Sequence, residues 1–257
     1  YIKHMDSIKL SRYAIEKSIQ CPRCYWYHYR HKINLGSFPF TLNMAVDNLV
    51  KNEFDHYRQI QKPHPIFEEN GIDALPFKHI KMNDWRNNFK GAYYRNEEEG
   101  YIFGGSVDDI WQKKSGELIV ADVKATSKNK FDWHDTFERY DYPKAYQRQL
   151  EMYQWVFRKF GYDVADEGYL LYFNGRKNED MFNNKLKFDT HLVKLDCSDI
   201  WVENQIKKAR DILLSDNLPD PSKDCDTCNY IKQRWNLHQS DVNEFIDRCS
   251  DKPSPRI

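Results

Sequence analysis

The chain has 257 residues, of which 39 are basic and 39 acidic, and this length suits one large domain or a domain with an appendage. No apolar run approaches the roughly 18 residues of a membrane helix, and the first residues contain no apolar segment typical of a secretory signal. The balanced charge excludes a strong overall attraction to nucleic acid, so such a partner requires a local basic patch. We therefore predict a cytoplasmic protein without a membrane segment.

Apolar residues recur at helical spacing in several segments, and short β-rich segments lie between them. Helices are predicted after Ser11, from Thr41 to before Pro63, over about residues 144–160 and over 200–214. Strands are predicted within 104–124, at 169–173 and at 186–195, whereas 63–90 is predicted to be irregular and 127–143 a loop. Helices on both sides of a central group of strands predict an α/β core.

Residues 104–124 are the most informative segment, because two apolar, β-rich stretches flank a polar turn at 113–116. Alternation along the second stretch puts Asp122 and Lys124 on one face of the strand. The hairpin can bring Asp108, from the first stretch, to the same face. Two carboxylates beside one ammonium group are costly unless something binds there, and a divalent cation is the obvious candidate.

Gln149 and Tyr153 lie on the helix predicted over about 144–160. They are four residues apart, so they share one face of that helix. Because the helix follows the strand of Asp122 after a single loop, it can pack beside that strand with its polar face toward the carboxylates. Each of these motifs alone is common by chance, and the prediction depends on their order and compatible geometry.

The order G-x-x-D, D-x-K and Q-x-x-x-Y resembles the RecB-like branch of the PD-(D/E)XK nuclease superfamily, over about residues 10–235. That branch includes helicase–nuclease subunits and the iron–sulfur nucleases of CRISPR adaptation. The resemblance implies a restriction-endonuclease-like core, in which helices flank a central mixed β-sheet. It also implies catalytic roles for five residues: Asp108 as the first acid, Asp122 as the second acid, Lys124 as the catalytic lysine, and Gln149 and Tyr153 as the motif of the following helix.

One position departs from the family pattern. The family usually carries a histidine, within a G-x-x-x-H pattern, on the helix before the strands. This chain reads Asn43-Met44-Ala45-Val46-Asp47 there, so Asp47 is the best counterpart. A carboxylate can also bind a cation, and the alternative is a solvent-facing helical aspartate.

The resemblance implies Mg²⁺ or Mn²⁺ as a cofactor, with Asp47, Asp108, Asp122 and the backbone carbonyl of Val123 as ligands. Such an ion lowers the pKa of a bound water and stabilises negative charge on the phosphoryl group. Lys124 would position or deprotonate that water, or offset charge.

The implied activity is that of a divalent-metal-dependent deoxyribonuclease. By resemblance, its substrates are single-stranded DNA or DNA ends, and its setting is DNA repair, recombination or CRISPR adaptation. The implied partners are DNA and a helicase or a CRISPR-adaptation protein. The alternative is a catalytically silent nucleic-acid-binding or assembly subunit with the same fold, which the missing histidine favours and the complete set of acids and lysine opposes.

Basic residues on the loop and helix start after the D-x-K strand form a candidate nucleic-acid-binding patch. They are Lys128, Lys130, Lys144 and Arg148. Such a patch would supply phosphate contacts, although a solvated charged surface has the same composition. The segment also contains Trp133, Tyr140, Tyr142 and Tyr146. Their rings could stack on unpaired bases or pack locally.

The second strong motif is a pair of C-x-x-C sequences, Cys21 with Cys24 and Cys225 with Cys228. Two residues between ligands allow both sulfurs to reach one metal centre. The pairs therefore predict a Cys₄ metal site that joins the N- and C-terminal segments like a clasp. RecB-like iron–sulfur nucleases are similar, with cysteines that flank the core and often hold a [4Fe–4S] cluster. Their usual division is one cysteine before the core and three after, whereas two and two also suits Zn²⁺. The resemblance therefore implies a [4Fe–4S] cluster, with Zn²⁺ as the alternative.

Domain boundaries follow from these motifs. Because His4-Met5 resembles a cloning remnant, the predicted domain begins at Met5. Residues 5–235 are predicted to form one nuclease domain that includes the clasp, and residues 236–257 a polar C-terminal tail.

Overall fold

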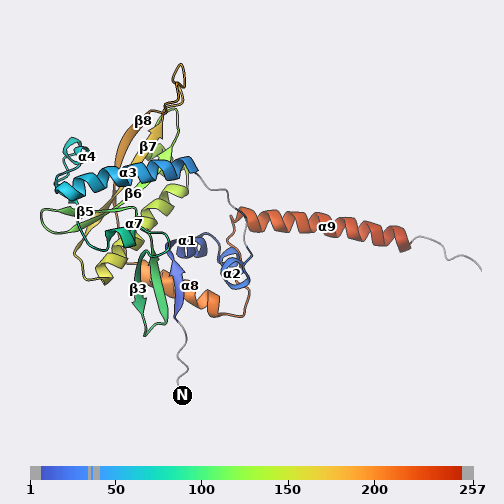
Figure 1. Cartoon of the computed structure of the whole chain (residues 1–257). Helices are drawn as coiled ribbons and strands as arrows, with labels where there is room; N and C mark the ends of the chain where they lie inside the picture. Colours follow the sequence, from blue (N-terminus) through green and yellow to red (C-terminus); the bar gives the residue numbers. More distant parts are fainter. Residues whose placement is uncertain (1–6, 34–35, 37–40, 251–257) are drawn as a thin grey trace, which may run out of the picture. The chain divides into compact units, whose positions relative to one another are not determined.

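A computed structural model describes residues 7–33, 36 and 41–250, with side chains described to residue 240 (Figure 1). The helices are α1 (Arg12–Gln20), α2 (Pro22–His31), α3 (Thr41–Ile60), α4 (Pro65–Glu69), α5 (Met82–Trp85), α6 (Trp133–Arg139), α7 (Tyr142–Lys159), α8 (Val202–Leu214) and α9 (Asp226–Ser250). The strands are β1 (Ile8–Ser11), β2 (Ala74–Pro76), β3 (Ala92–Asn96), β4 (Tyr101–Gly105), β5 (Asp109–Lys113), β6 (Leu118–Thr126), β7 (Val164–Gly175) and β8 (Phe188–Asp196).

The chain divides into two compact units. The described residues within Tyr1–Glu16 and Gly36–Arg210 form the sheet unit, and those within Lys17–Leu35 and Asp211–Ile257 form the cysteine unit. This division differs from the single domain expected over residues 5–235, because the segments that carry the two C-x-x-C motifs pack mainly with each other.

The sheet unit contains two β-sheets. The larger has the strand order β2-β5-β6-β7-β8, in which β6 and β7 are parallel and the other neighbours are antiparallel. The smaller has the order β1-β4-β3 and is also mixed. Strands β5 and β6 form the predicted hairpin, in which Asp109 pairs with Ala121.

Helices cover both faces of the larger sheet (Figure 1). On one face, Val46, Val50 and Phe54 recur at helical spacing on α3 and pack in a buried cluster with Ile119 and Ala121 of β6. On the other face lies α7, which contacts β6 and β7. This arrangement confirms the predicted mixed α/β fold, and no helix among the described residues is long and apolar enough to cross a membrane.

In the cysteine unit, side chains of α2 bind the backbone of the segment that precedes α9. The Arg30 guanidinium donates hydrogen bonds to the carbonyls of Leu213, at 2.9 Å, and Ser215, at 2.6 Å. The Arg23 side chain donates a hydrogen bond of 2.9 Å to the Pro219 carbonyl. These contacts bring together two segments that lie about 200 residues apart in the sequence, as the clasp requires.

Three predicted elements differ from the structure. The expected loop over 127–143 contains α6, because Asp132 caps a short helix by accepting a hydrogen bond from the Asp135 N–H. The expected irregular stretch 63–90 contains α4, β2 and α5. Residues 236–250 of the expected tail continue α9 as a helix, and 251–257 lie outside the described residues.

Candidate active site and metal centre

Strand β6 carries the D-x-K motif where it pairs in parallel with β7. Because Ile119 and Ala121 of this strand pack in the cluster with α3, Asp122 and Lys124 face α7. Asp122 is 1% exposed, and the side-chain amide of Gln149 donates a 2.5 Å hydrogen bond to its Oδ1. The Lys124 ammonium forms an ion pair with Asp122 Oδ2. The aspartate and lysine therefore lie together on one strand face, as the alternation predicts.

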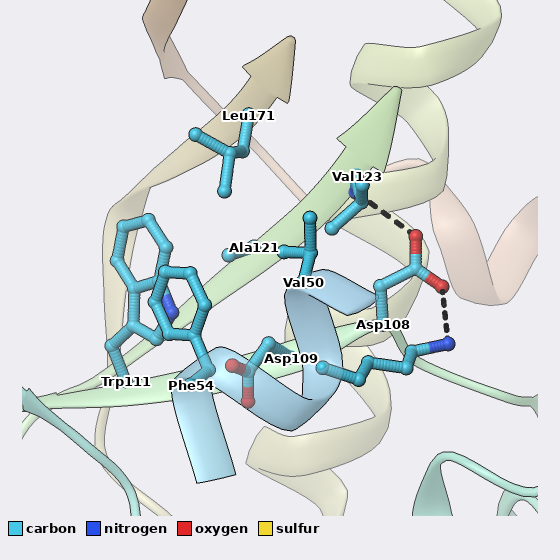
Figure 2. A pocket seen from close by; sticks show the side chains of 9 residues that line it. Val50, Phe54, Asp108, Asp109, Trp111, Ala121, Val123 and Leu171 are labelled. Carbon is cyan, nitrogen blue, oxygen red and sulfur yellow. Dashed lines mark hydrogen bonds and ion pairs between the residues drawn. The ribbon is translucent and has the colours of Figure 1, made fainter. Parts of the chain in front are cut away.

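Asp108 immediately precedes β5 and reaches the backbone of β6 (Figure 2). The Val123 N–H donates a 2.9 Å hydrogen bond to Asp108 Oδ2, and the carboxyl groups of Asp108 and Asp122 lie close enough to perturb each other's pKa. A cavity of about 10 Å³ adjoins Asp108 within the core, which is room for about one water molecule. The structure thus brings both predicted acids to one point.

Sequence reasoning missed Lys51, which links Asp47 to this pair of acids. Its Nζ lies 2.7 Å from Asp47 Oδ2 and 3.6 Å from Asp108 Oδ1. The signal in the sequence is the spacing of four residues between an acidic and a basic residue on a helix, which places both on one face of α3.

Tyr153 lies one helical turn after Gln149 and holds the backbone that leads into Asp108. Its hydroxyl donates a 2.5 Å hydrogen bond to the Ser106 carbonyl. A Cβ atom on Gly105 would lie 2.9 Å from that hydroxyl. Glycine at this position therefore lets the tyrosine approach the end of β4, which is a physical reason for the glycine before the first acid.

Lys124 is held by an aromatic ring as well as by its carboxylate partner. Its Nζ lies 4.6 Å from the ring centroid of Tyr146, which is a residue of α7. A cation over an aromatic face is attracted by the negative charge density of the ring. With 18% of its side chain exposed, Lys124 remains accessible from one direction.

The charges in the cluster perturb one another. Burial raises the pKa of Asp122 to about 7, and the neighbouring charge of Asp108 adds to the rise while Lys124 opposes it. Burial also raises the pKa of Asp47, with a further contribution from Asp108. For Asp108, burial acts to raise the pKa, but the ammonium groups of Lys124 and Lys51 outweigh it, so the pKa is lowered. The cluster contains three carboxyl groups, on Asp47, Asp108 and Asp122, but only two ammonium groups, on Lys51 and Lys124.

The donor set fits a divalent cation. Asp47 Oδ1 is buried and has no hydrogen-bond partner among the described residues. Carboxylate and carbonyl oxygens are the ligands that Mg²⁺ prefers in proteins. Only the four cysteines, among the described residues, form a group of metal-ligand atoms all within 4.8 Å of one another. The carboxylates of Asp47, Asp108 and Asp122 therefore do not all lie within 4.8 Å of one another. Lys51 lies between Asp47 and Asp108 and forms an ion pair with each.

The four basic residues of the predicted patch have different surroundings. Arg148 donates two hydrogen bonds, of 2.9 and 2.7 Å, to the buried carboxylate of Glu16, so its guanidinium already has a partner in the protein. Lys128 donates to Thr136 Oγ1 at 2.8 Å and to the Tyr142 hydroxyl at 3.0 Å. The side chains of Lys130 and Lys144 are 86% and 49% exposed. Lys130 and Lys144 are therefore open to solvent and Lys128 lines a pocket, whereas the guanidinium of Arg148 is bound to Glu16.

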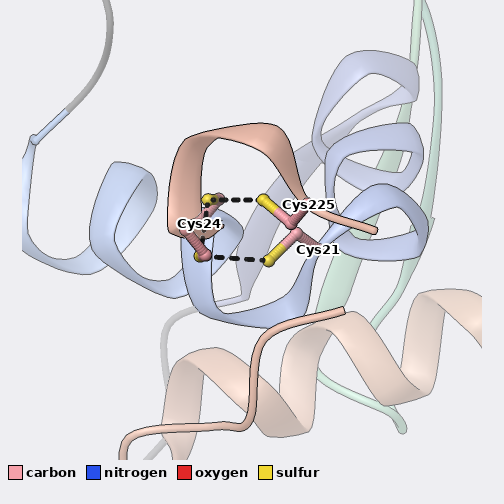
Figure 3. A group of neighbouring side chains, drawn as sticks. Cys21, Cys24 and Cys225 are labelled. Atoms are coloured by element: carbon pink, nitrogen blue, oxygen red, sulfur yellow. Dashed lines mark hydrogen bonds between the residues drawn. The ribbon is translucent and has the colours of Figure 1, made fainter. Parts of the chain in front are cut away.

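The four predicted cysteines lie together in the cysteine unit (Figure 3). The Sγ atoms of Cys24 lie 3.5 Å from Cys225 and 3.6 Å from Cys228, and Cys21 lies 3.8 Å from Cys228. Burial acts to raise the pKa of Cys21, but hydrogen bonds from the Cys24 and Ser222 backbone outweigh it and lower the pKa to about 7. Four sulfurs around one Zn²⁺, each at about 2.3 Å, would lie roughly 3.8 Å apart, which agrees with these separations.

Each motif begins a helix, which explains the geometry. Cys21 is the N-cap residue of α2 and Cys225 directly precedes α9, so the second cysteine of each pair lies in the first helical turn. The backbone N–H groups of Tyr25 and Asn229 donate to the carbonyls of Cys21 and Cys225. These turns point both sulfurs of each motif in a common direction, and the cluster can bind a metal.

Comparison with known proteins identifies a family. A model of the PD-(D/E)XK nuclease superfamily matches residues 41–233. No curated protein matches the chain. Among solved structures, one titled "Crystal structure of SSO0001" is similar at 14% sequence identity and a TM-score of 0.41, and the match covers 85% of this chain and 81% of that chain.

Proposed function

The chain belongs to the PD-(D/E)XK nuclease superfamily, and on this basis we propose that it is a divalent-metal-dependent nuclease that hydrolyses phosphodiester bonds in DNA. The observation that supports this most directly is the meeting of Asp108, Asp122 and Lys124 at one hairpin. Asp108, Asp122 and the Val123 carbonyl would hold Mg²⁺ or Mn²⁺, and Asp47 would add a further carboxylate.

When bound, the divalent ion would lower the pKa of a water molecule and stabilise the negative charge of the phosphoryl group. Lys124, 18% exposed beside Asp122, would hold the attacking water or offset charge on the phosphate. Gln149 fixes the Asp122 carboxylate, because its amide occupies Oδ1. Tyr153 fixes the approach to Asp108 through the Ser106 carbonyl.

The finer features of the substrate rest on the resemblance of the motif order alone. Single-stranded DNA or DNA ends are the proposed substrates, in DNA repair, recombination or CRISPR adaptation. The corresponding partner would be a helicase or a CRISPR-adaptation protein.

The experiment is a cleavage assay with labelled single- and double-stranded DNA in Mg²⁺, Mn²⁺ or EDTA. Wild-type protein should cut DNA with either metal and not in EDTA, and Asp122→Ala should be inactive. The matched control is Asp73→Ala, because this aspartate is 71% exposed and remote from the motifs in sequence. Cleavage that persists in EDTA and in Asp122→Ala would reject the site, and no cleavage of any substrate would favour a silent binding subunit.

For the cysteine cluster, we propose a single Zn²⁺ with a structural role. All four sulfurs lie within 4.8 Å of one another, and three of the pairs are 3.5 to 3.8 Å apart, which supports one tetrahedral ion. A [4Fe–4S] cluster, which the resemblance favours, places several iron atoms between its thiolates and so needs wider spacing. Elemental analysis of purified protein distinguishes the two, since zinc gives a colourless protein and iron with sulfide a brown one. Folded protein that contains neither metal would refute both.

A further inference from the structure

A cavity of about 270 Å³ opens beside the candidate active site. It is lined by Lys124, Ala125, Thr126, Lys128, Phe131, Trp133, Thr136, Tyr142, Tyr146 and Tyr172. Lys124 belongs both to this lining and to the ion pair with Asp122. A molecule in the cavity would therefore lie next to the group that is proposed to act on the scissile phosphate.

Aromatic rings supply much of this lining. Phe131 and Trp133 pack against Tyr172, with ring centroids 5.0 and 5.7 Å apart, and Tyr142 packs against Tyr146 at 5.6 Å. These contacts hold the rings in place but leave the cavity between the lining residues. The cavity lies just below the roughly 300 Å³ at which pockets for drug-sized ligands begin, so it suits one flat ring system.

The polar groups of the lining are cationic or able to form hydrogen bonds. The lining residues include two lysines and no carboxylate. The Tyr172 side chain is 5% exposed, and its hydroxyl has no hydrogen-bond partner among the described residues. A buried hydroxyl without a partner is unfavourable.

The loop that carries part of the lining is fixed before any ligand binds. Asn174 is buried and accepts a 2.7 Å hydrogen bond from the Lys128 N–H while donating a 3.1 Å bond to the Lys128 carbonyl. The Ser127 hydroxyl donates a 2.9 Å bond to the Gly175 carbonyl. A pre-formed site binds more tightly because little conformational entropy is lost on binding.

Given the nuclease activity proposed above, on which this inference rests, we propose that the cavity holds one unpaired nucleobase of the DNA strand being cut. Aromatic rings would stack on the base, and the ammonium groups of Lys124 and Lys128 would lie near its flanking phosphates. Aromatic stacking with a positively charged surface is how proteins bind single strands. A base in a duplex is paired and stacked, so it must first be flipped out of the stack, which costs about a few kcal/mol. The pocket therefore selects single-stranded or frayed DNA.

The first test measures binding without added Mg²⁺ or Mn²⁺, so that cleavage does not interfere and the metal of the cysteine cluster stays in place. A fluorescently labelled single-stranded oligonucleotide is titrated with wild-type protein, Trp133→Ala, Trp133→Phe and the control Phe89→Ala, whose parent side chain is 93% exposed. Trp133→Ala should bind roughly 5- to 100-fold more weakly, while Trp133→Phe should bind within about threefold of wild type because a ring remains. Equal affinity of Trp133→Ala and wild type would overturn the proposal.

The second test needs no altered protein. One abasic nucleotide is placed at successive positions of the oligonucleotide, and wild-type affinity should fall at one position only. Trp133→Ala should be insensitive to the abasic nucleotide at that position. An even response along the strand would overturn the pocket. If binding depends on the position of the abasic nucleotide but no metal-dependent cleavage occurs, the proposed nuclease activity is wrong and the base pocket still holds. If cleavage occurs but binding does not respond to the missing base, the base pocket is wrong and the nuclease activity still holds.

Discussion

The side-chain amide of Gln149 donates a 2.5 Å hydrogen bond to the carboxylate of Asp122, and both residues are buried. The bond crosses from α7 to β6, so it joins the helix that carries the Q-x-x-x-Y motif to the strand that carries the D-x-K motif. It explains why a glutamine, which can donate while leaving the acid its charge, lies at this helix position.

Replacement of this glutamine should disturb the acid without removing it. Gln149→Ala should reduce DNA cleavage roughly 10- to 100-fold, because partners that orient a metal-binding carboxylate contribute about this much. The measurement is the cleavage rate as a function of Mg²⁺ concentration. Gln147→Ala is the matched control on the same helix, since Gln147 donates instead to the Asp196 carbonyl. An unchanged rate in Gln149→Ala would show that the bond has no catalytic role.

Lys124→Ala should lower turnover by about two to three orders of magnitude, as loss of one charge-stabilising donor does in other enzymes. The single-turnover cleavage rate at saturating DNA measures this effect. Lys114→Ala removes a lysine that is 84% exposed in the β5–β6 turn and should leave the rate unchanged. Near-normal cleavage by Lys124→Ala would make the assignment of the catalytic lysine wrong.

Asp47 tests the position where the family usually has histidine. Asp47→Leu should need roughly tenfold or more Mg²⁺ for half-maximal cleavage, because it loses a metal-binding carboxylate and leaves Lys51 without a partner that lies 2.7 Å away. Asp47→His should retain more activity than Asp47→Leu, since an imidazole nitrogen can ligate a metal. If both variants have the wild-type metal requirement, Asp47 is no ligand.

The raised pKa of Asp122, about 7, predicts a pH-dependent stability of the protein without added Mg²⁺ or Mn²⁺. An unfolded aspartate has a pKa of about 3.9. Between these values the folded state keeps a proton that the unfolded state releases. The free energy of unfolding should therefore fall as pH rises from about 4 to 7. Denaturant unfolding measures it.

Asp122→Asn is the control for this pH effect, because an amide does not titrate. Its stability should decrease less than that of the wild type over the same pH range. Asp108 contributes with the opposite sign, since its pKa is lowered and its stabilisation is lost as pH falls. Parallel pH profiles of wild type and Asp122→Asn would contradict the raised pKa.

Removal of the cysteine-bound metal should destabilise the cysteine unit by several kcal/mol, because metal binding is coupled to folding in such sites. A strong chelator should lower the thermal unfolding midpoint of the wild type. Cys24→Ser, which removes one ligand, should start with a lower midpoint and respond less to the chelator. The same midpoint with and without chelator in metal-loaded wild type would show that the cluster has no structural role.

Local sequence patterns predicted much of the site. Short spacing decides which side chains lie on the same face of a strand or helix. Three patterns use it: the alternation along β6, the spacing of four between Gln149 and Tyr153, and the two C-x-x-C motifs. The hairpin needed only a polar turn between two β-rich stretches, and the structure confirms it. The helix α6 was missed because its Asp132 cap lies in a polar, aromatic stretch without clear periodicity.

The sequence by itself therefore determined that Asp122 and Lys124 share one strand face, that two cysteine pairs can meet and that the core is α/β, because these depend on periodicity and short spacing; the catalytic roles of the acids and the lysine remain predictions from the family resemblance. Only the tertiary structure decided that Lys51 bridges Asp47 and Asp108, that Arg148 is paired with Glu16, and that rings from α6, α7 and β7 surround one cavity. Such contacts join residues far apart in the chain. Their partners are set by how helices pack on the sheet, which no local pattern specifies.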